Sequence, residues 1–311
     1  MLRLTPLRTS GVKTPEAHEN FGTAEAVPSR EKCMRLSLTK RQPRSAALLR
    51  PISAILLGLL FFLGACNAHA QSLRIAAASD LQFALADLAA QYEKESGAKL
   101  AITYGSSGNF FAQIQNGAPF DLFFSADIAY PQKLIDAGFA ESDSRYSYAF
   151  GRIVLWLPSE SPLIPAKLQW NTLLDARIQK IAIANPDHAP YGRAAVAALQ
   201  KAGLYEQLKS KLVYGENISQ AAQFVLSGSA QAGILALSLA TAPAMISGKY
   251  WEIPRDLYPP LEQAVVLLKS SPNKPAARAF LAFLQTESAR AALARYGFTL
   301  PAASDSREVK P

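Results

Sequence analysis

The stretch KLAITYGSSGNFF, residues 99–111, joins an extended run to the start of a helix through a turn of glycines and serines. Residues 99–104 predict a strand, and Phe110, Phe111 and Ile114 recur at helical spacing. The turn between them is uncharged and places hydroxyls and backbone N–H groups where the helix begins. A strand, a polar turn and a helix in this order form the unit that α/β folds repeat.

This unit recurs in two series along the chain. The first series opens with a buried strand at 72–78, and the second opens with the strand RIVLWLP at 152–158. A late strand at 262–269 and two helices between residues 275 and 298 end the pattern. We therefore predict an α/β protein with two lobes, each built on a mainly parallel sheet flanked by helices.

The order of the two series predicts the domain boundaries. We expect lobe I to contain residues 71–150 and 260–299, and lobe II to contain residues 151–259. The chain would then cross twice between the lobes, and the double crossover would form a hinge. Residues 300–311 are read as a polar tail.

The basic character of the chain is concentrated before residue 71. The formal net charge is +8, but residues 1–70 hold ten Lys and Arg against four Asp and Glu, and the rest of the chain is nearly neutral. This balance gives no electrostatic support for a nucleic-acid partner.

The first 70 residues indicate an export signal. A basic segment precedes the uncharged run ISAILLGLLFFL at 52–63, which is too short to span a bilayer comfortably. Met34 would give a more usual signal length than Met1. Cleavage after Ala70 and lipidation of Cys66 are alternatives, and both predict an exported, periplasmic protein. No cysteine follows Gln71, so the mature body has neither a disulfide nor a thiolate site.

Four turns between strands and helices share a polar, uncharged character: Ser79-Asp80, 105–108, 190–192 and 216–219. In open α/β sheets, ligands bind beyond the carboxyl ends of the strands. Each turn would offer N–H groups at the positive end of a helix dipole, and three add hydroxyls. If the turns converge, they form an anion site built from neutral donors.

Other chemistries have less support in the sequence. His188 is the only histidine after residue 70, and neither Ser106 nor Ser107 lies in a nucleophile elbow. An exported serine hydrolase using Ser107 and His188 remains the alternative from a different class. Transition-metal cages lack ligands, and no phosphate-loop or dinucleotide motif is present. Scattered carboxylates, among them Asp121 and Asp127, are read as solvated cap or loop residues.

Three segments together resemble the molybdate-binding proteins of ABC importers. They are AAASD at 76–80, YGSSGNFFAQIQNGAPFDLFFSAD at 104–127 and ANPDHAPYGRAAVAAL at 184–199, followed by RYGF at 295–298. The resemblance implies a periplasmic type II substrate-binding protein that closes on molybdate or tungstate and delivers it to a membrane permease. It implies no catalysis and no cofactor, and we expect a monomer. Molybdenum would be held only as molybdate, through its oxygen atoms.

The resemblance also implies the residues that contact the oxyanion. Ser79 and Ser107 match hydroxyl donors, while Tyr191 and Ile218 match positions that donate a backbone N–H. Some relatives carry a binding tyrosine after a later strand, where this chain has Ala236. Tyr191 is therefore a candidate to supply a phenol as well as its amide.

The placement of the Asp80 carboxylate would determine which tetrahedral oxyanion the site prefers. We expect its backbone N–H to face the ligand while its carboxylate stays near the helix N-terminus. A site with only donors rejects protonated oxyanions, because their own O–H would meet a donor. If the Asp80 carboxylate entered the site, it would accept that proton and favour phosphate. Another oxyanion, sulfate or phosphate, is thus the alternative ligand.

Overall fold

The computed structural model describes residues 72–163 and 168–302. The export signal, the start at Met34 and the lipidation of Cys66 lie outside the described residues, as does the polar tail after Ala302. No helix within the described ranges is long and apolar enough to cross a membrane.

Lobe I is built on a five-stranded sheet with the order β2-β1-β3-β10-β4. The strands are β1 (Leu73–Ala78), β2 (Leu100–Gly105), β3 (Leu122–Ser125), β4 (Tyr146–Gly151) and β10 (Leu261–Leu267). Strand β1 runs parallel to β2 and β3, whereas β10 runs antiparallel to β3 and β4. The return of β10 to this sheet places it between strands that lie more than a hundred residues earlier.

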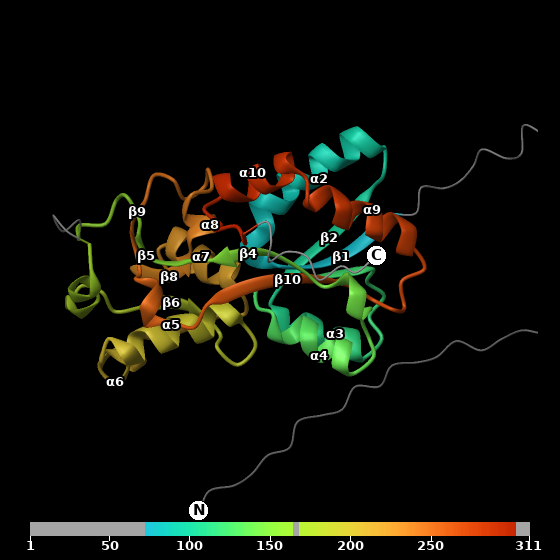
Figure 1. Ribbon diagram of the computed structural model, residues 1–311. Coiled ribbons are helices and arrows are strands. Elements are labelled where there is room, and N and C mark those ends of the chain that lie inside the picture. Colours follow the sequence, from blue (N-terminus) through green and yellow to red (C-terminus); the bar gives the residue numbers. More distant parts are fainter. Residues whose placement is uncertain (1–71, 164–167, 303–311) are drawn as a thin grey trace, which may run out of the picture. The chain divides into compact units, whose positions relative to one another are not determined.

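Helices cover both faces of this sheet (Figure 1). They are α2 (Gln82–Ser96), α3 (Ser107–Gln115), α4 (Ala129–Asp136), α9 (Lys274–Leu284) and α10 (Glu287–Arg295), with short 3-10 turns η1 (Ser79–Leu81) and η2 (Ser142–Ser144). Helices α2, α9 and α10 bury apolar side chains on one face, and α3 and α4 do so on the other. Both faces are therefore core, as continuous apolar strands require.

Lobe II is built on a second five-stranded sheet with the order β7-β6-β8-β5-β9. The strands are β5 (Ile153–Leu157), β6 (Ile181–Ala184), β7 (Leu212–Gly215), β8 (Ala232–Ala236) and β9 (Lys249–Glu252). Strand β6 is parallel to β7 and β8, whereas β5 is antiparallel to β8 and β9.

Four α-helices and three short 3-10 turns accompany the second sheet. They are α5 (Pro190–Lys201), α6 (Tyr205–Leu208), α7 (Ile218–Leu226), α8 (Leu237–Ala240), η3 (Trp170–Leu174), η4 (Lys209–Lys211) and η5 (Arg255–Leu257). Helices α5 and α7 present alanines to the sheet, and this lets their backbones pack closely on β6. The turns that lead into these two helices are held by that packing.

The two-lobed α/β fold is confirmed, but the expectation of mainly parallel sheets needs correction. Both sheets are mixed, because each contains antiparallel strands that adjoin the crossovers between the lobes: β4 and β10 in the first sheet, β5 and β9 in the second. The chain passes from β4 to β5 through Arg152 alone and returns between β9 and β10. Strands β4 and β9 were not predicted from the sequence.

Candidate functional site

The four turns singled out from the sequence line one small cavity. The lining residues are Ala78, Ser79, Asp80, Gly105, Ser106, Ser107, Ala126, Ala189, Pro190, Tyr191, Asn217 and Ile218. The cavity measures ≈ 10 Å³, which is about the space that one water molecule needs. It lies at the carboxyl ends of β1, β2, β3 and β7 and at the start of α5, where α/β proteins place their ligands.

Ser79 contacts the opposite lobe through its hydroxyl. Its Oγ donates to Asn217 Oδ1 at 3.1 Å and accepts from the backbone N–H of Ser219 at 3.3 Å. Ser219 Oγ in turn donates to the carbonyl of Ser79 at 2.9 Å. Ser79 begins the turn η1 and makes no side-chain cap, so its hydroxyl serves the contact between the lobes.

Ser107 is completely buried at the first position of α3. Its Oγ accepts the backbone N–H of Ala126 at 2.9 Å, and this ties the turn after β2 to the turn after β3. The neighbouring Ser106 is the N-cap of α3 and accepts from Asn109 N. The two serines thus have different roles, and only the hydroxyl of Ser107 joins two of the cavity's loops.

Tyr191 and Ile218 stand in the first turns of α5 and α7. Backbone N–H groups at such positions have no partner within their own helix and are available to a ligand. Asn217 caps α7 by accepting from Gln220 N at 3.0 Å. The phenol of Tyr191 donates to Asp80 Oδ2 at 2.9 Å, so this hydroxyl is engaged with a protein group.

The carboxyl of Asp80 lies in the interior between the lobes, only 1% exposed. Its Oδ2 accepts from Tyr191 and from Gln263 Nε2, the latter at 2.6 Å. Tyr148 extends the cluster by donating to Gln263 Oε1 at 2.9 Å. The partners of the carboxylate are therefore side chains of α5 and β10, while Asp80 itself lies in the first turn of η1, directly before α2.

Burial raises the pKa of Asp80 to about 6, against an ordinary value near 4, although hydrogen bonds from Gln263 and Tyr191 act in the opposite direction. Burial and the nearby Asp80 also raise the pKa of Tyr191 well above its usual range. Sequence reasoning missed Gln263. Its signal in the sequence was weak, because Gln263 follows the charged Glu262 and precedes the apolar run AVVL of β10.

Further contacts join the two lobes around the cavity. The backbone N–H of Gly108 donates to the carbonyl of His188 at 2.8 Å. Arg193 forms an ion pair with Asp127 at 2.6 Å, and its guanidinium lies 5.5 Å from the centroid of the Tyr130 ring. Asp127 is therefore a contact between lobes and not a solvated loop residue.

Asp121 also departs from its prediction as a solvated residue, because it is fully buried. Its carboxylate accepts from Arg74 N at 2.7 Å and from Ser271 Oγ at 2.6 Å, with Asn273 nearby. These bonds hold the segment before β3 against the loop after β10. The role of Asp121 is structural.

The catalytic pair of the hydrolase alternative is not assembled. The ring of His188 bonds through Nε2 to the carbonyl of Glu216 at 2.9 Å, within its own lobe. Within the described ranges, no hydrogen bond joins this ring to Ser107, whose Oγ bonds to Ala126 N. These ranges also contain no group of three or more His, Cys, Asp or Glu side chains that could hold a metal ion.

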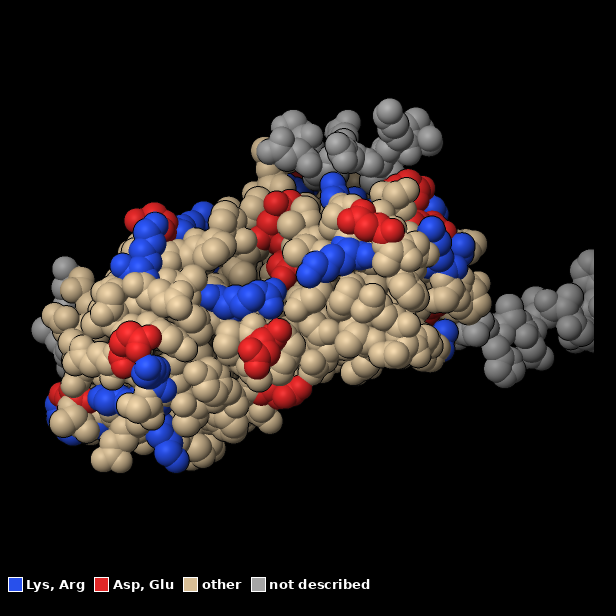
Figure 2. All heavy atoms as spheres, turned by 90° about the horizontal axis from the view of Figure 1, so that it is seen from below, with Lys and Arg blue, Asp and Glu red and all other residues tan. Residues whose placement is uncertain are grey.

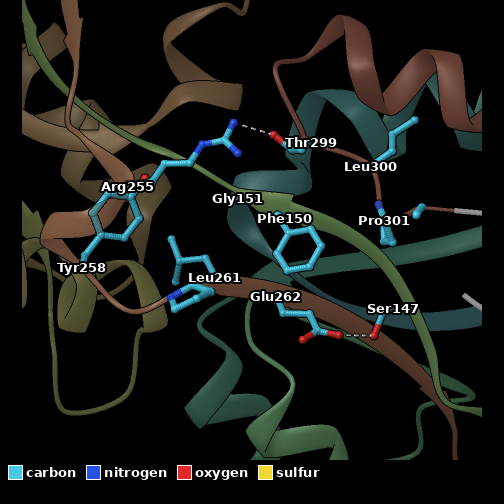
Figure 3. Close-up of a pocket in the computed structure, with 12 residues that line it drawn as sticks. Ser147, Phe150, Gly151, Arg255, Tyr258, Leu261, Glu262, Thr299, Leu300 and Pro301 are labelled. Carbon is cyan, nitrogen blue, oxygen red and sulfur yellow. Dashed lines mark hydrogen bonds between the residues drawn. The ribbon is translucent and has the colours of Figure 1, made fainter. Parts of the chain in front are cut away.

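A second, larger cavity of ≈ 590 Å³ lies beside the crossover (Figure 3). Phe150, Leu261 and Leu300 contribute apolar lining. Two pairs of its polar side chains are hydrogen-bonded, Arg255 with Thr299 at 2.8 Å and Glu262 with Ser147 at 2.7 Å. None of the turns singled out from the sequence reaches this cavity.

Charge on the surface is mixed where it can be seen. On the face in Figure 2, Lys and Arg side chains are dispersed among Asp and Glu. Among the described residues, no Lys or Arg lines the small cavity, and Asp80 is the one carboxylic acid in its lining. Any anion held there would be bound by hydroxyls and amides rather than by a cation.

Comparisons with known proteins agree with this architecture. The family model for bacterial extracellular solute-binding proteins matches residues 73–299. The molybdate-binding protein ModA of Azotobacter vinelandii is 39% identical over 257 residues, which cover 82% of this chain and 99% of the relative. ModA of Rhodobacter capsulatus is 38% identical over 213 residues, covering 68% and 82%.

Solved structures give the same result. The periplasmic molybdate-binding protein of Azotobacter vinelandii superposes with a TM-score of 0.70 at 36% identity, covering 74% of this chain and 100% of that one. The substrate-binding domain of a putative molybdenum ABC transporter from Clostridium difficile gives 0.58 at 28% identity, covering 74% and 99%. The resemblance seen in the sequence is confirmed, and the chain belongs to the family of bacterial extracellular solute-binding proteins.

Proposed function

We propose that this protein captures molybdate or tungstate between its lobes and delivers the oxyanion to an ABC permease in the membrane. The observation that carries the proposal is the meeting of four polar turns, from both lobes, around one cavity whose described lining residues include no Lys or Arg. The relatives named as molybdate-binding proteins support the choice of ligand.

The donor set suits a dianion. We propose that the hydroxyls of Ser79 and Ser107 and the backbone N–H groups of Asp80, Tyr191 and Ile218 bind the oxyanion oxygens. A buried dianion costs tens of kcal/mol on a Born estimate unless it is compensated. Hydrogen bonds to charged groups return about 1.5–3 kcal/mol each, and the N-termini of α3, α5 and α7 add favourable dipoles.

Capture requires the lobes to move. A tetrahedral oxyanion is larger than the ≈ 10 Å³ that the cavity offers, so its loops must separate to admit the ligand. Ser79, Gly108 and Asp127 each contact the opposite lobe and would have to release their partners. Because donors come from both lobes, the bound oxyanion favours the closed arrangement.

The remaining expectations follow from the same proposal. We expect a monomer that needs no cofactor, performs no catalysis and binds no nucleic acid. We expect it in the periplasm, released after cleavage or anchored by a lipid on Cys66. Sulfate or phosphate in place of molybdate, and a hydrolase using Ser107 and His188, are the outcomes that the following experiment can reveal.

Calorimetric titration of the purified protein with molybdate, tungstate, sulfate and phosphate tests the proposal. We expect micromolar or tighter binding of molybdate or tungstate and no heat from sulfate. A preference for sulfate or phosphate would change the ligand and keep the binding function. Hydrolysis of ester substrates that is lost on His188→Ala would contradict the proposal altogether.

A further inference from the structure

Asp80 occupies a position where both lobes meet. Its Oδ2 accepts from Tyr191 of lobe II and Gln263 of lobe I, and its backbone carbonyl accepts from Ser238 Oγ of lobe II at 2.8 Å. The side-chain hydrogen bonds to the carboxyl therefore both end on Oδ2. Two of these three donors come from the lobe opposite to Asp80, so the group is positioned when the lobes are closed.

The second carboxyl oxygen of Asp80, Oδ1, has no hydrogen-bond partner among the described residues. Among the described residues, Oδ1 of Asp80 is the one buried side-chain oxygen or nitrogen that lacks a hydrogen-bond partner. Asp80 also lines the small cavity together with Ser107 and Ile218. Buried polar atoms without partners are rare in folded proteins and call for an explanation, and a ligand that binds at the site is one.

Within the part of the chain that the structure describes, no Lys, Arg or His forms a hydrogen bond or ion pair with this carboxyl. The titratable groups around it are Tyr191 of α5 and Tyr148 of β4, with Tyr258 and Asp127 next to those two tyrosines. Gln263 of β10 and Ser238 of α8 are neutral. Arg193 on α5 is already paired with Asp127 and does not contact Asp80.

The electrostatic conflict is therefore direct. An ionised Asp80 would stand beside a dianion in a cavity that excludes water, and like charges at short range in a medium of low dielectric repel strongly. A neutral Asp80 removes the repulsion and turns Oδ1 from an acceptor into a donor. Burial, which already raises the pKa of Asp80 to about 6, acts in the same direction as the dianion would.

Resting on the proposed function, we propose that Asp80 is protonated in the complex and donates a hydrogen bond from Oδ1 to an oxyanion oxygen. Capture of one dianion then takes up one proton from solvent, and release returns it. No covalent bond of the oxyanion forms or breaks. Asp80 is thus a residue that sets the pH range and the specificity of capture.

The proposal separates two ligand classes by their protons. Molybdate arrives without a proton, so the proton must come from solvent to Asp80. Hydrogen phosphate carries its own O–H and can donate it to an ionised Asp80, so its binding needs no uptake. The number of protons taken up on binding therefore reports which partner carries the shared hydrogen.

The test is calorimetric titration with molybdate between about pH 6 and about pH 8, in two buffers of different ionisation enthalpy. For the wild-type protein we expect uptake of about half a proton per molybdate near pH 6, where free Asp80 is already about half protonated, and nearly one proton at higher pH. The affinity for molybdate should fall by about tenfold for each unit by which the pH rises, between the pKa of Asp80 in the free protein and its higher pKa in the complex. For Asp80→Asn we expect no uptake and an affinity that is independent of pH.

Asp127→Asn is the matched control, because Asp127 is another acid at the contact between the lobes and does not line the cavity. It should retain the proton uptake of the wild-type protein. The wild-type proton count needs no variant, so the test stands even if Asp80→Asn fails to fold.

Three results overturn the inference. Tight molybdate binding by the wild-type protein with no proton uptake rejects it and leaves the proposed function standing. Unchanged proton uptake in folded Asp80→Asn assigns the proton to another group. Failure of the wild-type protein to bind molybdate at any pH rejects the proposed function itself, and the inference with it.

Discussion

The hydroxyl of Ser107 joins two loops of the cavity, and its removal should mainly lower the affinity for the ligand. We expect Ser107→Ala to weaken molybdate binding by about tenfold or more, because a buried acceptor is lost and Ala126 N–H is left without its partner. Calorimetric titration measures the change. Molybdate binding as tight as in the wild-type protein would remove Ser107 from the site.

Ser144 provides a matched control for this change. Its Oγ is also buried and accepts a backbone N–H, that of Leu267, at 2.9 Å, but it lies outside the cavity. Ser144→Ala should lower the free energy of unfolding by about 1–3 kcal/mol and leave molybdate affinity unchanged. A loss of affinity equal to that of Ser107→Ala would mean that the effect is one of general stability.

Individual residues show which parts of the site could be predicted from the sequence. Ser79 and Ser107 were found because polar side chains after strands have a local signature. The partners of Asp80 had none, since Tyr191 and Gln263 lie 111 and 183 positions away along the chain. Whether a carboxylate faces water or the interior is decided by such distant contacts, and so Asp80 and Asp121 could not be placed from the sequence.

At the scale of elements, the start of α3 approaches lobe II without room for a side chain. A Cβ on Gly108 would lie 2.6 Å from both the carbonyl oxygen of His188 and the hydroxyl of Tyr130. Alanine favours a helix by about 1 kcal/mol over glycine, yet it would obstruct closure. We expect Gly108→Ala to reduce molybdate affinity roughly five- to a hundredfold without lowering the thermal stability of the ligand-free protein.

Gln113→Ala is the matched control for Gly108→Ala, because Gln113 is an exposed residue of the same helix. It should raise helix propensity and leave affinity unchanged. Titration and thermal unfolding of both variants separate the two effects. If Gly108→Ala bound molybdate like the wild-type protein, the contact with His188 would not belong to the bound state.

Elements were predictable where their pattern was local. The alternation of buried strands and amphipathic helices led to both sheets and most of the helices. Strand β4, with the sequence YSYAFG, was missed although its aromatic residues Tyr146, Tyr148 and Phe150 alternate with small residues at the period of a strand. The antiparallel direction of β10 could not be predicted either, since it depends on where the chain re-enters the first sheet and not on residues 261–267 themselves.

For the molecule as a whole, binding and stability are linked. A ligand at about a hundred times its dissociation constant adds about 2.7 kcal/mol to the free energy of unfolding. For a body of this size we expect molybdate to raise the melting temperature by roughly 5–10 °C. Differential scanning calorimetry measures the shift. Sulfate at the same concentration should cause none, and an equal shift with sulfate would refute discrimination between them.

The position of β10 has a consequence for the order in which the molecule forms. This strand lies between β3 and β4, so the first sheet lacks an inner member until residues 261–267 have been synthesised. All five strands of the second sheet lie between residues 153 and 252. A chain that emerges from its amino end can therefore complete its middle portion first. The earliest strands meanwhile keep open edges, which a holding chaperone can shield until the last segment arrives.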